Sequence, residues 1–202
     1  MDIVAHTLWA AAGATVIHRR RPLKRSAVLI TLVLAALPDV IHLLPIASWW
    51  LFADGSFDAL WGYAVAVPGQ EPVLPPQVGL LSHHLHCVMH SAPIAGLVTL
   101  ALWWVRRTFW IPLLGWWSHI VIDVFTHSAD YYAVPVLYPF TERGFDGIAW
   151  ITPWFMALNY TALAAVGVWL LMSRKRPDRG QQTADQSAFD DRPAGAVRHH
   201  GC

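Results

Sequence analysis

Charged residues and cysteines are both scarce in this sequence. Lys, Arg, Asp and Glu together make up 13% of its 202 residues, whereas a soluble domain carries roughly 25%. With only two cysteines, Cys87 and Cys202, the chain cannot contain a disulfide framework. Hydrophobic residues make up 55% of the chain, and many of its 12 tryptophans lie near the ends of apolar runs, as they do at membrane interfaces. This composition predicts an integral membrane protein.

Basic residues occur in clusters that separate the apolar segments. Five apolar segments can be drawn, at about residues 3–17, 26–53, 88–105, 109–127 and 154–172. Clusters of Arg and Lys lie between the first and second, between the third and fourth, and after the fifth, whereas the connections 54–82 and 128–153 are mainly acidic. By the positive-inside rule we expect a bundle of about five transmembrane helices, with the N-terminus outside and the C-terminus in the cytoplasm. Because the basic residues are not spread over one face, we expect no nucleic-acid binding.

Proline and polar composition mark the irregular parts of the chain. Pro38 and Pro45 should kink the second segment, because each leaves a carbonyl one turn earlier without its donor. The proline-rich connection 54–82 should be irregular apart from a short helix near 56–66. We therefore expect one helical membrane domain over residues 1–172 and a polar, disordered cytoplasmic tail over 173–202.

The stretch GWWSHIVIDVFTH, residues 115–127, contains the clearest chemical pattern. It is apolar and free of proline, so we expect a helix. His119, Asp123 and His127 follow one another at intervals of four residues, and this spacing places all three on one face. Two imidazoles beside a carboxylate in an apolar helix indicate a metal site. The alternative is that each polar side chain only satisfies a neighbouring helix.

Other polar groups interrupt the apolar segments at a similar depth. They are Asp2 with His6, Asp39 with His42, and His83, His86 and His90, with His84 and Cys87 beside them. Counting about 1.5 Å per residue from each cytoplasmic end places most of these residues in one layer, in the outer half of the membrane. Ionisable residues at that depth are costly and usually functional. We expect Cys87 to be a packed thiol and His84 to be solvated at the interface.

The mixture of His and Asp favours particular ions. Imidazole and carboxylate ligands favour Zn²⁺, followed by Mn²⁺ or Fe²⁺, whereas Mg²⁺ and Ca²⁺ prefer more oxygen ligands. The candidate ligands outnumber those that one tetrahedral Zn²⁺ uses, so the sequence allows one ion with supporting residues or two ions.

Four motifs resemble those of a known family. They are HTLWAAAG from His6 to Gly13, Pro38-Asp39, the HxxxHS of His86, His90 and Ser91, and GxxxHxxxDxxT from Gly115 to Thr126, which is followed by LYPF at 137–140. In this order they resemble the membrane-bound metal-dependent hydrolases, a family typified by a bacterial inner-membrane protein of the DNA-damage regulon. The resemblance covers about residues 1–140. Two positions depart from it, because Ile41 stands where the family has an acidic residue and Cys87 where it has Arg. The order of the motifs also resembles, more weakly, that of zinc-dependent phospholipases C.

The residues and the resemblance together imply a hydrolase in the inner membrane. Its substrate would be a phosphoester or ester of a lipid or lipid-linked molecule near the outer leaflet, and a metal ion would activate water. The expected metal ligands are Asp39, His86, His90, His119 and Asp123, with His6 and His127 as further candidates; the expected catalytic residues are Asp39, Asp123 and His42. The alternatives are a transporter of metal ions or protons, which needs a polar path to the cytoplasm that we do not find, a haem protein, and a structural metal site.

Overall fold

Apolar runs bounded by proline, glycine or polar residues fold into helices throughout residues 1–173, the part of the chain that the computed structural model describes. These residues form eight α-helices and no strand, which confirms the all-α fold class. The helices are α1 (Ile3–Arg20), α2 (Arg25–Ile41), α3 (Leu44–Phe52), α4 (Phe57–Ala64), α5 (Pro76–Met89), α6 (Ala92–Arg106), α7 (Leu113–Thr126) and α8 (Pro153–Met172). The predicted disordered tail lies, beyond Ser173, outside the described residues.

Fewer than five of the described helical segments could span a membrane by their length and composition. Among the described helices, α8 alone is long and apolar enough to cross a membrane unaided. Two more spans result if α2 is joined to α3, across a bend of 64°, and α5 to α6, across a bend of 61°. The apolar helix α7 has 14 residues, fewer than the roughly 20 that a span needs. The structure therefore contains one to three candidate spans, and the five-span bundle is not confirmed.

The helices break at residues that the sequence analysis predicted as site residues. The predicted segment 26–53 is two helices that meet at His42 and Leu43. The predicted segment 88–105 begins instead with the end of α5, and His90 lies at the bend before α6. The side chain of Ser91 accepts a hydrogen bond from the Ile94 amide, and this cap starts α6 in a new direction.

The fourth segment also differs from its prediction at its end. The helix expected over 115–127 stops at Thr126, and His127 has an extended backbone. The three-residue series on one helical face is therefore reduced to His119 and Asp123. The predicted short helix near 56–66 is present as α4, whose first turn is capped by the Ser56 side chain.

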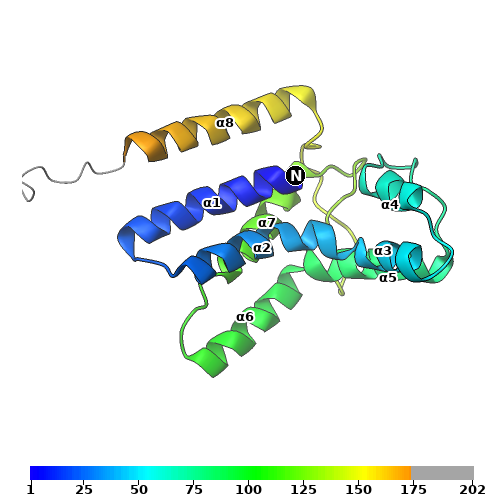
Figure 1. Ribbon diagram of the computed structural model, residues 1–202, viewed down its shortest axis with the longest axis horizontal. Helices are drawn as coiled ribbons and strands as arrows, with labels where there is room; N and C mark the ends of the chain where they lie inside the picture. The colour runs from blue at the N-terminus through cyan, green and yellow to red at the C-terminus, as the bar shows by residue number, and fades with distance from the viewer. Residues whose placement is uncertain (174–202) are drawn as a thin grey trace, which may run out of the picture.

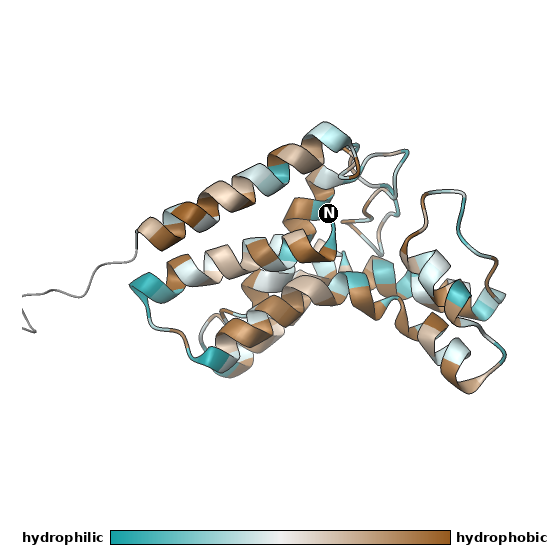
Figure 2. Cartoon of the chain, turned by 45° about the horizontal axis from the view of Figure 1, so that its top comes forward, coloured by the Kyte–Doolittle hydropathy of each residue, from teal (hydrophilic) through white to brown (hydrophobic). Residues whose placement is uncertain are grey.

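Helices α1, α2 and α7 pack together in the middle of the molecule, and α8 lies along α1 (Figure 1). The C-terminal ends of α1, α6 and α8 lie toward one side, while α3, α4, α5 and the long connections lie toward the other. In Figure 2 hydrophilic residues gather at the turn between α1 and α2, and the outer surfaces of α6 and α8 are largely apolar. Such surfaces suit contact with lipid. The side of the membrane on which each end lies stays a prediction.

Helix α7 approaches α2 closely at Gly115. A Cβ atom at this position would lie 2.0 Å from the carbonyl oxygen of Thr31 and 3.1 Å from the amide nitrogen of Ala35. Only glycine allows the two backbones to come this near. Because His119 lies one turn after Gly115, this contact also brings the polar face of α7 against α2.

Replacing Gly115 should therefore disturb the whole packing of α7. We expect Gly115→Ala to destabilise the protein by about 1–3 kcal/mol, the usual cost of overpacking, and to lower the melting temperature in detergent by several degrees. Gly96→Ala is a matched control in α6, because a Cβ atom there meets nothing within 4 Å. Equal melting temperatures for the two variants would contradict the close contact between α2 and α7.

Candidate metal centre

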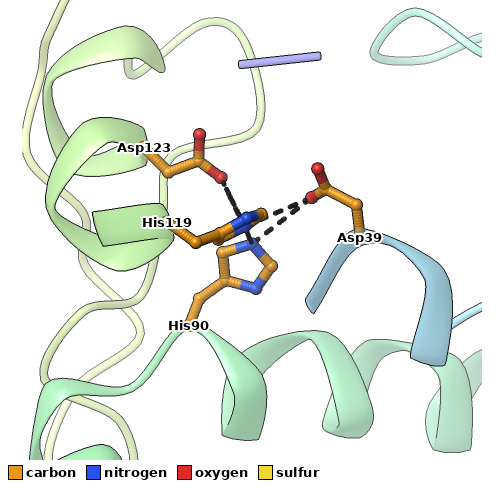
Figure 3. Close-up of side chains that lie close together, drawn as sticks. All are labelled: Asp39, His90, His119 and Asp123. Carbon is orange, nitrogen blue, oxygen red and sulfur yellow. Dashed lines mark hydrogen bonds and ion pairs between the residues drawn. The ribbon is translucent and has the colours of Figure 1, made fainter. Parts of the chain in front are cut away.

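Four side chains from separate parts of the chain meet between α2, α5 and α7 (Figure 3). Asp39 follows Pro38 in the last turn of α2, His90 lies at the bend after α5, and His119 and Asp123 lie one turn apart on α7. Each residue offers one ligand atom, and these four atoms all lie within 4.8 Å of one another. They form a group that could hold a metal ion, which we call the four-residue group.

The spacing of the ligand atoms matches that around a single ion. His119 Nε2 lies 3.0 Å from His90 Nε2, 3.1 Å from Asp123 Oδ2 and 3.4 Å from Asp39 Oδ1. His90 Nε2 lies 3.3 Å from Asp123 Oδ2 and 3.6 Å from Asp39 Oδ1. Four atoms that bind an ion tetrahedrally at 2.0–2.1 Å would lie about 3.3 Å from one another. The four-residue group therefore has the size of a tetrahedral metal site.

The protonation pattern of the two imidazoles also fits a cation. His119 Nδ1 donates to the carbonyl of Ala35 at 2.7 Å, and His90 Nδ1 donates to the carbonyl of His86 at 2.8 Å. A carbonyl oxygen can only accept, so Nδ1 bears the proton and a neutral ring directs its Nε2 lone pair into the group. Two lone pairs and two carboxylate oxygens then face one another without a shared proton. Such a set is repulsive unless a cation or additional protons occupy its centre.

Burial distinguishes Asp39 from the other three residues. The side chains of His119 and Asp123 are 0% exposed and that of His90 is 1% exposed, whereas the Asp39 side chain is 19% exposed. Asp39 Oδ1 also has the two longest distances of the five given above. The group is therefore enclosed around His90, His119 and Asp123 and is partly open beside Asp39, where the exposed part of the side chain does not include the buried Oδ2 atom.

Asp123 uses its two carboxylate oxygens differently. Oδ2 faces the two imidazoles, whereas Oδ1 accepts hydrogen bonds from His6 Nε2 at 2.7 Å and from Thr126 Oγ1 at 3.3 Å, and contacts the amino group of Met1. The His6 ring also stacks on His119, with the ring centroids 3.9 Å apart. His6 thus lies beside the four-residue group, where it holds two of its members in place, as supporting residues do in metal sites.

Three further histidines predicted as site residues lie close to the group but outside it. The His86 ring lies 4.1 Å from the His90 ring, and the His42 ring lies 5.5 Å from the His86 ring. His127 Nδ1 donates to the main-chain carbonyl of Asp123 at 3.1 Å. Their roles as ligands or catalytic groups stay predictions. His84, by contrast, is exposed and hydrogen-bonded to the Tyr138 hydroxyl.

Backbone groups are the part of the site that the sequence analysis missed. The carbonyls of Ala35 and His86 orient the imidazoles of His119 and His90. Because every residue has a backbone carbonyl, the amino-acid sequence does not indicate which carbonyls accept such hydrogen bonds. Pro38 offered only an indirect signal, because it leaves the carbonyl of Leu34, the residue before Ala35, without its helical donor. Thr126 stands at the last position of the GxxxHxxxDxxT motif, which could have indicated its bond to Asp123.

The long connection after α7 covers the C-terminal end of that helix. Backbone amides of Gly147, Ile148 and Trp150 donate to the carbonyls of residues 127, 125 and 126 at 2.8–3.0 Å. The two long connections are themselves joined, because the Tyr132 hydroxyl donates to Glu71 at 2.5 Å. Burial and this carboxylate raise the pKa of Tyr132, while the hydroxyl lowers the pKa of Glu71. Both shifts favour a protonated Tyr132 hydroxyl beside an ionised Glu71 carboxylate at neutral pH.

Comparison with known families agrees with this picture of a membrane protein. The family model described as YdjM inner membrane protein matches residues 1–183, most of the chain. The chain belongs to this family. Membership supports a location in the inner membrane, in keeping with the candidate spans. No curated protein and no solved structure matches the chain.

The four-residue group predicts how metal binding responds to substitution. Asp123→Asn keeps the volume of the side chain but removes its charge, so it should weaken Zn²⁺ binding by more than the 10–100-fold that follows the loss of a supporting residue. Competition of the purified protein with a chromophoric chelator measures this affinity. His84→Ala, a change in an exposed histidine of α5, should leave it unaltered. Equal affinity in the two variants would place the ion elsewhere.

Proposed function

We propose that this membrane protein is a metal-dependent hydrolase that cleaves a phosphoester or ester bond of a lipid or lipid-linked substrate. The main support is the four-residue group, in which three enclosed ligands are combined with one partly open side. Two histidines and one carboxylate are a common ligand set of catalytic zinc sites, which keep a further position accessible. His90, His119 and Asp123 would form this set, and the accessible position would lie beside Asp39.

The chemistry of the donors favours Zn²⁺, with Mn²⁺ or Fe²⁺ as the next candidates. A divalent cation in this position would supply Lewis acidity toward a phosphoryl or acyl oxygen and would lower the pKa of water. It would also balance the negative charges of two carboxylates in an apolar environment, where uncompensated charge is costly.

The residues around the opening have the properties that a hydrolase needs. The carboxylate of Asp39 is the charged group at the open side, where it would orient the attacking water. His42 lies three residues further along the chain and would face the same space. Asp123 is enclosed, and both of its oxygens already have contacts, so its geometry favours the role of ligand over that of catalytic base.

Apolar grooves beside α1 support a substrate with hydrocarbon chains. One groove, of about 320 Å³, lies between α1 and α7 and includes Ala10 and Ser118. Its lining residues Ala10 and Ser118 lie one helical turn after His6 and directly before His119 in the sequence, so the groove runs along the helices that bear these two histidines. Its volume lies in the range of ligand-binding pockets, about 300–1,000 Å³.

The test is hydrolysis by purified protein loaded with Zn²⁺ or Mn²⁺ and offered a panel of phosphatidyl and polyprenyl phosphoesters and carboxylic esters. Turnover should be lost on chelation and restored by metal. Asp39→Asn, at saturating metal, should lower the rate by at least about 100-fold, as when an active site loses a charge-stabilising group. Asp58→Asn is the control, because Asp58 lies in the first turn of α4 and is exposed. No chelator-sensitive turnover by metal-loaded wild-type protein on any substrate would contradict the proposal.

A further inference from the structure

Two ligand-type atoms at the open side of the four-residue group have no partner. Asp39 directs Oδ1 toward His90 and His119, but its Oδ2 is buried and forms no hydrogen bond with the described residues. The Nδ1 atom of His42 is likewise buried and without a hydrogen-bond partner among them. Burying a carboxylate oxygen or an imidazole nitrogen without a partner costs free energy. A bound cation would offset this cost.

Helices α2 and α5 each present two ligand-type side chains about one turn apart. Asp39 and His42 are three residues apart at the end of α2, and His86 and His90 are four apart at the end of α5, so each pair shares a helical face. One member of each pair belongs to the four-residue group, and His42 and His86 are the other members. The Ser82 hydroxyl donates to the His42 carbonyl at 2.6 Å, which fixes the end of α2 on α5.

The spacing of His42 and His86 resembles that of the two imidazoles in the four-residue group. The ring centroids of His90 and His119 are 4.9 Å apart with an interplanar angle of 63°. Those of His42 and His86 are 5.5 Å apart with an angle of 85°. Neither His42 nor His86 belongs to the group whose ligand atoms all lie within 4.8 Å, so this second set is less tightly gathered. We therefore expect it to bind an ion more weakly than the first.

We propose that His42, His86 and Asp39 Oδ2 bind a second divalent cation, with the Asp39 carboxylate bridging the two ions. This inference rests on the proposed function and narrows its substrate. In two-metal hydrolases the ions lie about 3.5–4 Å apart and stabilise both the attacking and the leaving oxygen. Two adjacent cations match the several anionic oxygens of a phosphoester better than the single carbonyl oxygen of a carboxylic ester. The substrate class is then a lipid phosphoester.

Manganese provides a direct probe of the second ion. The full-length protein, stripped with a chelator and reloaded with Mn²⁺, should retain two ions per chain by elemental analysis. Its electron paramagnetic resonance spectrum should show coupling between them. The double variant His42→Ala/His86→Ala should retain one ion with an uncoupled spectrum. The control is the single variant His84→Ala, which removes an exposed histidine of α5. This variant protein should retain both ions.

Two results would overturn the second site: a single ion per chain in wild-type protein, or two coupled ions in the double variant. The wild-type stoichiometry and spectrum decide the matter even if the double variant fails to fold. The experiment is also separate from the test of the proposed function. Two bound ions without turnover would contradict the proposed hydrolase activity and support the second metal site. Turnover by protein with a single bound ion would support the hydrolase activity and contradict the second metal site.

Discussion

Two imidazole nitrogens and two carboxylate oxygens meet in the middle of this protein, and much of the fold serves to hold them there. The Nε2 atoms of His90 and His119 face two carboxylate oxygens at 3.1–3.6 Å. The Nδ1 atom of each imidazole donates to a backbone carbonyl. The position of each carbonyl depends on how the helices pack or where they end. The Ala35 carbonyl reaches α7 because Gly115 allows the two backbones to approach closely. The His86 carbonyl reaches His90 because α5 ends at the residue before it.

This constraint explains why the helices are broken where they are. In a straight span the ligand-type side chains of α2 and α5 would project at fixed intervals along a single axis. The bend of 64° lies at His42 and Leu43, three residues after Asp39, and the bend of 61° lies at His90 and Ser91. The connections 53–56 and 65–75 and the helix α4 between them lie on the same side of the molecule as α3 and α5 (Figure 1). The candidate spans and the candidate metal ligands thus share the same breaks in the helices.

The sequence predicted the all-helical fold and the gathering of Asp39, His90, His119 and Asp123 through two simple regularities. Ligand-type residues were spaced at helical intervals, and their depths agreed between segments that run in opposite directions. Pro38 and Pro45 predicted a kink in the second segment, but not a complete break at His42 and Leu43. The bend at His90 was not predicted, because apolar periodicity looks the same in a straight helix and in two helices joined at a histidine. For the same reason His127 was assigned to a helix that ends one residue earlier. The distinction between His90 within the group and His86 beside it depends on the rotation of α5, which a four-residue spacing does not specify.

The central claim is that two histidines and at least one carboxylate bind one ion without help from sulfur. X-ray absorption spectroscopy of the protein loaded with a single equivalent of Zn²⁺ tests it most directly. The account predicts nitrogen and oxygen ligands alone at about 2.0–2.1 Å, together with the outer-shell scattering of two imidazole rings. A sulfur ligand at about 2.3 Å, which would indicate Cys87, or a spectrum without imidazole scattering would contradict it.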